Sequence, residues 1–437
     1  MTTAKITGWG RNGSVPMRTL SPTSIDDLAR DAFPDERLLA RGFGRSYGDA
    51  AQLDGGTAVL SSECRSIEWL DRDAGVVRVD AGVSIGELID TVVPLGFFVP
   101  VSPGTRHVSI GGAIAADIHG KNHHVDGSFG AHVRSVRLRL ADDSLVAIGP
   151  DQEAALFWAT VGGMGLTGII LDAVIALSPI ASSIVAVETS RHASLPELMS
   201  VMVESDRSHR FSVAWVDLVG PQRSVLTQGA FARAEALAPH AAGPLRRPRS
   251  PNLRLPPIPP LRFVQRPLVR AFNELWFRRA PAEPTISHES ITGFFHPLDA
   301  IRDWNRLYGP RGFLQWQCVV EDDEALQEIC EALSGLPAFF VVLKRLGPAN
   351  AAPLSFPTTG WTLAVDVPVT ASVLHALHGL DQLVVDAGGR IYLAKDARMS
   401  RDTFEAGYPR LEEWRRIRRA VDPSRRFRSD LANRLGL

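Results

Sequence analysis

The stretch from residue 100 to residue 130 constrains this chain more than any other. It holds six glycines and four histidines, and short apolar pieces alternate with Gly-rich turns. Because glycine has no Cβ and tolerates a positive φ, such a backbone can approach a ligand closely and turn its N–H groups toward phosphate oxygens. His119, Lys121, His123 and His124 can donate protons or hydrogen bonds beside it. The stretch predicts a cofactor site; the alternative is a set of tight hairpins that need glycine.

Two further Gly-rich turns lie in the same half of the chain. One, GFGRSYGDAAQ at 42–52, follows an expected strand at 37–41, and the other, GGMGLTG at 162–168, precedes a long apolar strand at 168–177. Neither is the dinucleotide pattern in which G-x-G-x-x-G opens the helix of a βαβ unit. Three such turns joined by short strands predict an α+β cofactor domain whose loops share one ligand.

Composition sets broader limits. A length of 437 residues predicts two or three domains, and a net charge of -1 argues against bulk electrostatic binding of nucleic acid. The three cysteines, Cys64, Cys318 and Cys330, fit neither a disulfide framework nor a zinc site. The N-terminus has no apolar leader, and no apolar run reaches the roughly 18 residues of a membrane span. We therefore expect a cytoplasmic protein, or one held peripherally at a membrane.

The second half of the chain changes character after about residue 183. Long strands are expected at 210–218, 290–296, 312–320, 338–346 and 361–369, and helices alternate with them. This pattern predicts an antiparallel sheet covered on one face, and hence a separate substrate domain. Near the C-terminus, residues 390–400 read as a strand that carries Lys395.

Residues 245–270 stand apart because they hold seven arginines and no acidic residue, interleaved with prolines and apolar side chains. Proline at this density excludes regular helix or a central strand. The segment is either a surface loop or a lid over the substrate that touches an anionic or membrane-bound partner.

Four motifs together carry a family resemblance: RGFGRSYGDAA, PGTRHVSIGGAIAADIHGKNHH, FWATVGGMGLTGII and YLAKDAR. They resemble the FAD-binding signature set of the vanillyl-alcohol-oxidase superfamily, and within it the flavoenzymes of arabinan precursor synthesis in cell walls. The resemblance implies a two-domain α+β fold. Its FAD-binding domain would be split between residues 1–183 and 390–437, and a substrate domain built on an antiparallel sheet would occupy residues 184–389.

The resemblance also implies an activity. The enzyme would oxidise the 2-hydroxyl of a polyprenyl-phosphoryl ribose to the 2-keto sugar, and a separate keto-reductase would complete the epimerisation. The partners would be this lipid-linked sugar phosphate and, through residues 245–270, a membrane surface. The alternative is an FAD-dependent oxidase or dehydrogenase of a soluble sugar or sugar alcohol. A third hypothesis is a flavoprotein that serves only as a binding scaffold.

The cofactor residues follow from the same resemblance. Backbone N–H groups of the loops at 40–50 and 104–112 would hold the FAD pyrophosphate, and residues 116–119 would flank the flavin. Related sugar-alcohol oxidases carry a histidine, bonded covalently to the flavin, where this chain has Arg45, so the FAD should be non-covalent, and no metal is implied. The implied set is Ala40, Arg41, Gly42, Phe43, Gly44, Arg45, Ser46, Tyr47, Gly48, Asp49, Ala50, Gly104, Ser109, Ile110, Gly111, Gly112, Ala116, Asp117, Ile118, His119, Ile170 and Tyr392.

The catalytic candidates are Lys395 and His119, and the sequence leaves open which of them is the base. Lys344 matches a lysine suited to a substrate phosphate, and Gln315 and Gln317 should share one sheet face because the strand period is two. Trp215 matches a pocket position, with a core aromatic as the equal alternative.

Four residues depart from the mycobacterial pattern and bear on the substrate. Thr362 stands where an asparagine is usual, Ala364 replaces a cysteine, Phe295 replaces a tyrosine, and Val213 replaces a serine. Thr362, Ala364 and Phe295 are kept as substrate-site candidates. The missing cysteine predicts resistance to inhibitors that bond covalently to that thiol.

Overall fold

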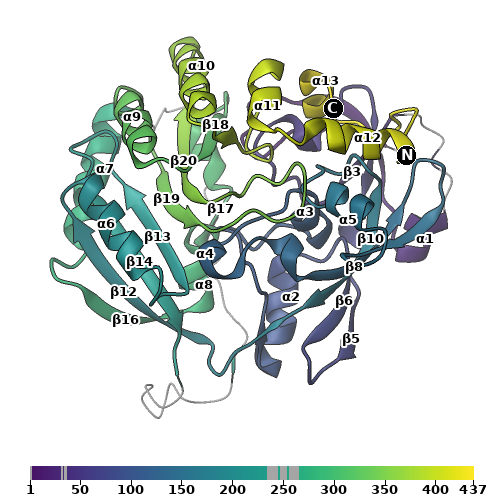
Figure 1. The fold of residues 1–437 in the computed structure, drawn as a ribbon, viewed down its shortest axis with the longest axis horizontal. Coiled ribbons are helices and arrows are strands. Elements are labelled where there is room, and N and C mark those ends of the chain that lie inside the picture. The colour runs from purple at the N-terminus through teal and green to yellow at the C-terminus, as the bar shows by residue number, and fades with distance from the viewer. Residues whose placement is uncertain (1, 31–32, 34–36, 234–244, 247–252, 255–264) are drawn as a thin grey trace.

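The computed structural model of the protein describes residues 2–30, 33, 37–233, 245–246, 253–254 and 265–437. Figure 1 shows a large sheet on one side of the molecule and smaller sheets on the other, with the C-terminal helices above the smaller ones. The fold is therefore α+β, as predicted.

Two smaller sheets come from the N-terminal half. The strand order of the first sheet is β1 (Thr2–Ile6), β2 (Val15–Leu20), β4 (Thr57–Leu60) and β3 (Leu38–Arg41). In this sheet β4 runs parallel to both of its neighbours. The other is antiparallel, in the order β5 (Ile67–Asp71), β6 (Val76–Asp80), β10 (Ile169–Ala176), β8 (Val133–Arg139) and β9 (Leu145–Ile148). A separate pair joins β7 (Phe97–Phe98) to β11 (Ser178–Pro179). β-Branched residues dominate the central strand β10, as its buried position requires.

Side-chain caps begin two of the helices of this half. Ser84 and Glu87 form a reciprocal capping box at the start of α2 (Ile85–Val92), and Ser109 Oγ accepts a hydrogen bond from Gly112 N, at 3.2 Å, at the start of α3 (Ile110–Ala115). Each such cap is worth about 1 kcal/mol. The other helices are α1 (Ile25–Arg30), α4 (His123–Asp126) and α5 (Ala154–Thr160).

The large sheet is antiparallel, as the sequence predicted, and it has eight strands among the described residues. Their order is β16 (Thr285–Ser290), β12 (Ile184–His192), β14 (Ser224–Phe231), β13 (Phe211–Val216), β19 (Val341–Leu346), β20 (Gly360–Pro368), β18 (Phe313–Val320) and β21 (Arg390–Ile391).

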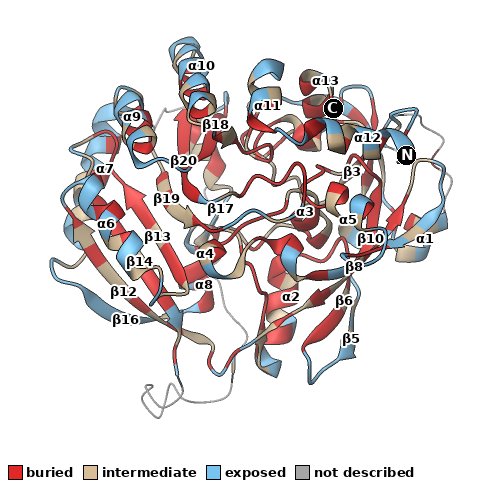
Figure 2. Ribbon diagram, in the orientation of Figure 1, coloured by how far each residue is buried: buried red, intermediate tan, exposed pale blue. Residues whose placement is uncertain are grey.

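The alternation of β18 explains how this sheet is covered. Leu314, Trp316 and Cys318 lie in one apolar core with helices α9 (Asp323–Ser334) and α10 (Ala371–Asp386), and α6 (Leu195–Ser205) adds to the same core. Figure 2 shows red, buried strands beneath helices whose outer sides are pale blue. The intervening residues Gln315 and Gln317 point to the opposite face because successive side chains alternate.

The C-terminal tail packs against the N-terminal half. Phe427 forms a parallel bridge with Leu38 beside β3, and Arg434 makes an ion pair with Asp49 at 2.9 Å. The tail contains α11 (Arg401–Gly407), α12 (Leu411–Val421) and α13 (Asp430–Leu435). This packing is what a split domain requires, while the limits drawn at residues 183 and 389 stay a prediction.

Two expected strands were wrong. Ser290 Oγ accepts from Gly293 N at 3.1 Å, so this cap starts helix α8 (Ile291–Phe295) within the predicted strand at 290–296. After β21 the chain turns, because Lys395 N donates to Tyr392 O at 3.0 Å. Lys395 therefore lies on a turn and not in a strand.

The segment at 245–270 is described only in part. Its end begins helix α7 (Arg266–Arg279), and β15 (Leu253–Arg254) pairs with β17 (Ile301–Arg302). Residues 247–252 and 255–264, on which the expectation of a lid also rested, lie outside the described residues.

Candidate active site

A cavity of about 290 Å³ lies between the polar face of the large sheet and the Gly-rich loops of the N-terminal half. The loop after β3 and the residues around α3 line one side of it, and β18, β19, β20 and the turn at Lys395 line the other. All three Gly-rich turns of the sequence contribute to this lining, so they meet at one cavity. That they share one ligand stays a prediction.

The loop after β3 offers free backbone donors. Within the described part of the chain, the N–H groups of residues 43–46 have no hydrogen-bond partner, and these residues line the cavity. Gly44 has a φ of +61°, which favours glycine. Free backbone N–H groups next to a cavity are the kind of donor that suits an anionic phosphate group.

The second loop differs from the prediction. Ile110 N donates to Val83 O at 2.8 Å, and Gly111 N donates to Ala81 O at 2.9 Å. Together with the Ser109 cap on Gly112, these bonds leave residues 110–112 without free N–H groups. The expected phosphate cradle at 104–112 is therefore wrong for these three residues, whose glycines serve close packing instead. A Cβ on Gly111 would lie 3.0 Å from the Ala81 Cβ.

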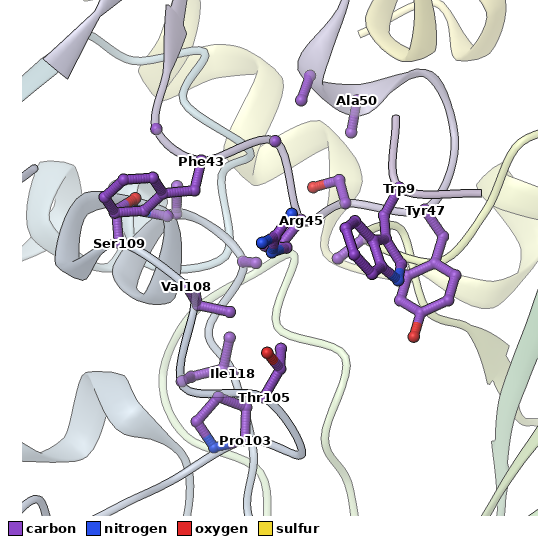
Figure 3. A pocket seen from close by; sticks show the side chains of 18 of the residues that line it. Trp9, Phe43, Arg45, Tyr47, Ala50, Pro103, Thr105, Val108, Ser109 and Ile118 are labelled. Atoms are coloured by element: carbon purple, nitrogen blue, oxygen red, sulfur yellow. The ribbon is translucent and has the colours of Figure 1, made fainter. Parts of the chain in front are cut away.

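Arg45 brings positive charge to this end of the cavity. Its guanidinium lies over the Trp9 ring, with Cζ 4.1 Å from the ring centroid, and Figure 3 shows the two side chains next to each other. Withdrawal from water lowers the pKa of Arg45, but an arginine stays charged at neutral pH. The cation therefore faces the same space as the free N–H groups.

The polar face of the large sheet forms the opposite wall. The register pairs Gln317 with Ala364, and Lys344 with Thr362. Cross-strand partners share a face, so Gln315, Gln317, Lys344 and Ala364 all line the cavity. The prediction that the two glutamines share a face is confirmed.

A chain of hydrogen bonds orients His119. Thr362 Oγ1 donates to Cys318 O, and Gln317 Nε2 lies 2.9 Å from Thr362 Oγ1 and 3.0 Å from His119 Nε2. Because this amide nitrogen donates, His119 Nε2 accepts and the ring proton lies on Nδ1. Within the described residues, that buried Nδ1 has no partner. Burial, followed by the charge of Lys344, lowers the pKa of His119 well below its usual value, so the ring is neutral.

Lys395 projects from the turn after β21. Its Nζ lies 3.7 Å from the centroid of the Tyr47 ring, and Tyr47 N donates to Ala394 O at 2.9 Å, which joins this turn to the loop after β3. Removal from bulk water lowers the pKa of Lys395 to about 7, with the carboxylate of Asp366 opposing the shift and Lys344 adding to it. The same desolvation lowers the pKa of Lys344 to about 8. Both amines can therefore be neutral near physiological pH.

Asp366 is a functional candidate that the sequence did not reveal. It is fully buried beside the cavity, where Gln315 Nε2 donates to it at 2.6 Å and Tyr308 OH at 3.1 Å. Burial raises its pKa to about 7, against the hydrogen bonds and the charge of Lys395, which lower it. The sequence alone does not indicate that Asp366 lies near the cavity. The strand register, which pairs Asp366 with Gln315, is what reveals it.

The structure sorts the predicted residues into two groups. Those that line the cavity are Ala40, Arg41, Gly42, Phe43, Gly44, Arg45, Ser46, Tyr47, Ala50, Gly104, Ser109, Gly111, Gly112, Ala116, Ile118, His119, Ile170, Gln315, Gln317, Lys344, Ala364, Tyr392 and Lys395. Those outside its lining are Gly48, Asp49, Ile110, Asp117, Trp215, Phe295 and Thr362.

The residues outside the lining support the cavity or belong to cores. Asp117 is buried and accepts from Ser128 Oγ and Gly130 N, both at 2.9 Å, so it fixes the turn before His119. Phe295 packs at 4.9 Å against both Phe98 and Phe211. The phenylalanine that replaces the usual tyrosine at position 295 therefore lies in an aromatic core and not at the cavity.

Sequence reasoning also missed lining residues. Trp9, Trp304, Phe340 and Val342 line the cavity, although none of them was a candidate from the sequence. Val342 precedes Lys344 by two residues on β19, so strand period alone would have indicated it.

Comparison with known proteins identifies the family of this chain. An FAD binding domain family matches residues 24–149, and the D-arabinono-1,4-lactone oxidase family matches residues 363–435. Over its whole length the chain is 41% identical to the decaprenylphosphoryl-β-D-ribose oxidase of Mycolicibacterium smegmatis, of which it covers 98%. The chain belongs to the decaprenylphosphoryl-β-D-ribose oxidase family.

This family membership confirms the resemblance and the enzyme class. The chain is an FAD-dependent oxidoreductase, with an FAD-binding domain of the vanillyl-alcohol-oxidase type and a C-terminal region of the arabinono-lactone oxidase type. A Streptomyces alditol oxidase is 29% identical, but over only 41% of this chain and 43% of its own length.

The residues present in the cavity fit FAD. The free N–H groups of residues 43–46 and the Arg45 guanidinium suit a pyrophosphate. The unpartnered Nδ1–H of His119 is a donor that needs an acceptor, which the polar edge of a flavin offers.

Proposed function

We propose that this member of the decaprenylphosphoryl-β-D-ribose oxidase family oxidises the 2-hydroxyl of a polyprenyl-phosphoryl ribose to the 2-keto sugar. A separate keto-reductase then completes the epimerisation. The observation that carries the proposal is the convergence of Lys395, Lys344, Gln317 and His119 on one cavity with the phosphate-binding loop. Full-length identity to the mycobacterial oxidase supports the lipid-linked sugar over a soluble alditol.

In this proposal Lys395 takes the proton of the 2-hydroxyl. Its pKa of about 7 makes the neutral amine abundant at working pH, which is where a general base is most effective. His119 is unsuited to this task because its Nε2 already accepts from Gln317. We therefore assign His119 a positioning role, in which its Nδ1–H holds the cofactor. Bound FAD supplies the two-electron acceptor for the hydrogen on the sugar carbon.

Lys344 holds the phosphate of the substrate. It lies half-buried on the central strand β19, where burial lowers its pKa to about 8. The single negative charge of an incoming phosphodiester would stabilise the charged form of this amine. Gln315 and Gln317 present amides beside it for the sugar hydroxyls. The polar wall thus binds the head of the substrate and the loop after β3 binds the cofactor.

The FAD is held without a covalent bond. Arg45 occupies the place of an anchoring histidine, no cysteine belongs to the cavity lining, and His119 is engaged through Nε2. Acid precipitation should release all the yellow cofactor, and the intact mass should equal that of the polypeptide alone. A mass increased by one FAD contradicts this part of the proposal.

The substrate is tested by turnover. Purified holoenzyme is mixed without oxygen with polyprenyl-phosphoryl ribose, or with free alditols in parallel, while flavin absorbance is followed. The proposal expects bleaching with the lipid-linked sugar at far lower concentration than with any alditol. Bleaching by alditols alone supports the soluble-sugar alternative, and bleaching by neither substrate contradicts both.

A further inference from the structure

Helix α7 carries an apolar face that the rest of the described chain leaves uncovered. Leu275 is 69% exposed, Leu268 53%, Trp276 45% and Phe272 44%. At 100° per residue these four side chains fall within one arc of the helix, next to the arc that buries Val269 and Asn273 against the protein. Exposed large apolar side chains gathered on one face mark an interaction site.

The charges around this face are mostly basic. α7 holds arginines at positions 266, 270, 278 and 279 and a single acidic residue, Glu274. Glu274 is already paired, since Arg223 and Arg278 both donate to it. The exposed surface therefore combines Trp, Phe and Leu with an excess of arginine, which suits an anionic lipid surface.

The position of α7 connects it with the active site. The Phe272 ring lies 5.6 Å from that of Phe339, and the next residue, Phe340, lines the cavity. In Figure 1, α7 lies at the outer edge of the large-sheet side, and Figure 2 shows much of it in pale blue. A lipid bilayer on this face would lie beside the wall of the substrate cavity.

We infer that α7 docks the enzyme on an anionic bilayer, with Leu268, Phe272, Leu275 and Trp276 inserted among the lipids and the arginines at the head groups. In the described residues no helix is long and apolar enough to cross a bilayer, so this contact would be peripheral. The inference deepens the proposed function and rests on it: a substrate with a polyprenyl tail stays in the membrane, and the cavity must come to it.

The test measures binding of the full-length holoenzyme to vesicles by co-sedimentation. The vesicles contain phosphatidylcholine mixed with phosphatidylglycerol, or phosphatidylcholine alone. The wild type should bind the mixed vesicles better than the neutral ones, and salt should weaken the binding. Leu275→Asp should reduce the partition coefficient about tenfold or more, because it removes one buried apolar side chain from the contact.

Leu145→Asp is the matched control. Leu145 is 52% exposed on β9, in the other half of the molecule, so the same substitution there should leave binding unchanged. Bound FAD and thermal midpoint should match the wild type in both variants. With a short-chain, water-soluble substrate analogue and no vesicles, Leu275→Asp should turn over at the wild-type rate.

Three outcomes overturn the inference. One is equal vesicle binding by Leu275→Asp and the wild type, and another is no preference for anionic lipid. The third is a dimer that Leu275→Asp dissociates, because a second copy would then cover the face. Failure of turnover in the wild type, with vesicle binding intact, would instead contradict the proposed function.

Discussion

Replacement of Lys395 by arginine tests whether this residue acts as a base or only as a fixed positive charge near the flavin. Arginine keeps the positive charge but cannot become neutral in a protein. At pH 7 an ordinary lysine, with a pKa of 10.5, is neutral in about one molecule in 3,000, whereas Lys395, with a pKa of about 7, is neutral in about half of them. The fold thus supplies the neutral amine that proton removal needs.

The expected decrease in the rate of flavin bleaching follows from this role as a base. Lys395→Arg should slow flavin bleaching about 10²- to 10⁴-fold, the usual contribution of a general base. In the wild type, bleaching should also slow about tenfold for each pH unit below about 7, because only the deprotonated amine accepts the proton. Both rates are measured by anaerobic stopped flow at saturating substrate, with bound FAD checked by absorbance.

Lys344→Arg is the matched control, since it makes the same change on the opposite wall of the cavity. It should alter KM more than kcat, because Lys344 binds the substrate and takes no proton. If Lys395→Arg bleaches at close to the wild-type rate, or if the wild-type rate is flat from about pH 6 to pH 8, then Lys395 is not the base.

Three further predictions concern single contacts. Gly42→Ala places a Cβ 2.1 Å from Ser109 Oγ, so bound FAD should fall and the free energy of unfolding should drop by about 1–3 kcal/mol in denaturant titrations; an unchanged protein would contradict the close packing. Gln317→Leu leaves His119 Nε2 without its donor, and should reduce stability by about 1–3 kcal/mol and slow turnover, whereas a wild-type rate would show that His119 needs no orientation. The wild type should form no adduct with a thiol-directed inhibitor, because its three cysteines are buried, but Ala364→Cys should gain one by intact mass.

The strands of the active site were predictable because their periodicity is local. Residues 314–318 of β18 alternate between apolar side chains and glutamine, and this pattern alone assigns Gln315 and Gln317 to one face. The family motifs likewise led to Lys344 and Lys395, which the structure brings to the same cavity.

What the sequence could not predict depends on contacts between distant residues. Trp9 lies at the cavity because its backbone N–H bonds to Ser46 O in the loop after β3. Asp366 lies there because the register of β18 and β20 pairs it with Gln315. The N–H groups of Ile110 and Gly111 resembled phosphate donors, yet they bond to the segment at 81–83. A glycine in a turn therefore indicates close approach without saying whether a ligand or another strand approaches.

Isotopic substitution at the sugar carbon tests the central claim most directly. Polyprenyl-phosphoryl ribose carrying deuterium at C2, or at C3 as a control, is mixed anaerobically with the holoenzyme, and the first-order rate of flavin bleaching is recorded. The account predicts that deuterium at C2 slows flavin bleaching while deuterium at C3 does not. It also predicts that the sugar product carries a 2-keto group. Equal rates for both labelled sugars, with the keto group at another carbon, would contradict it.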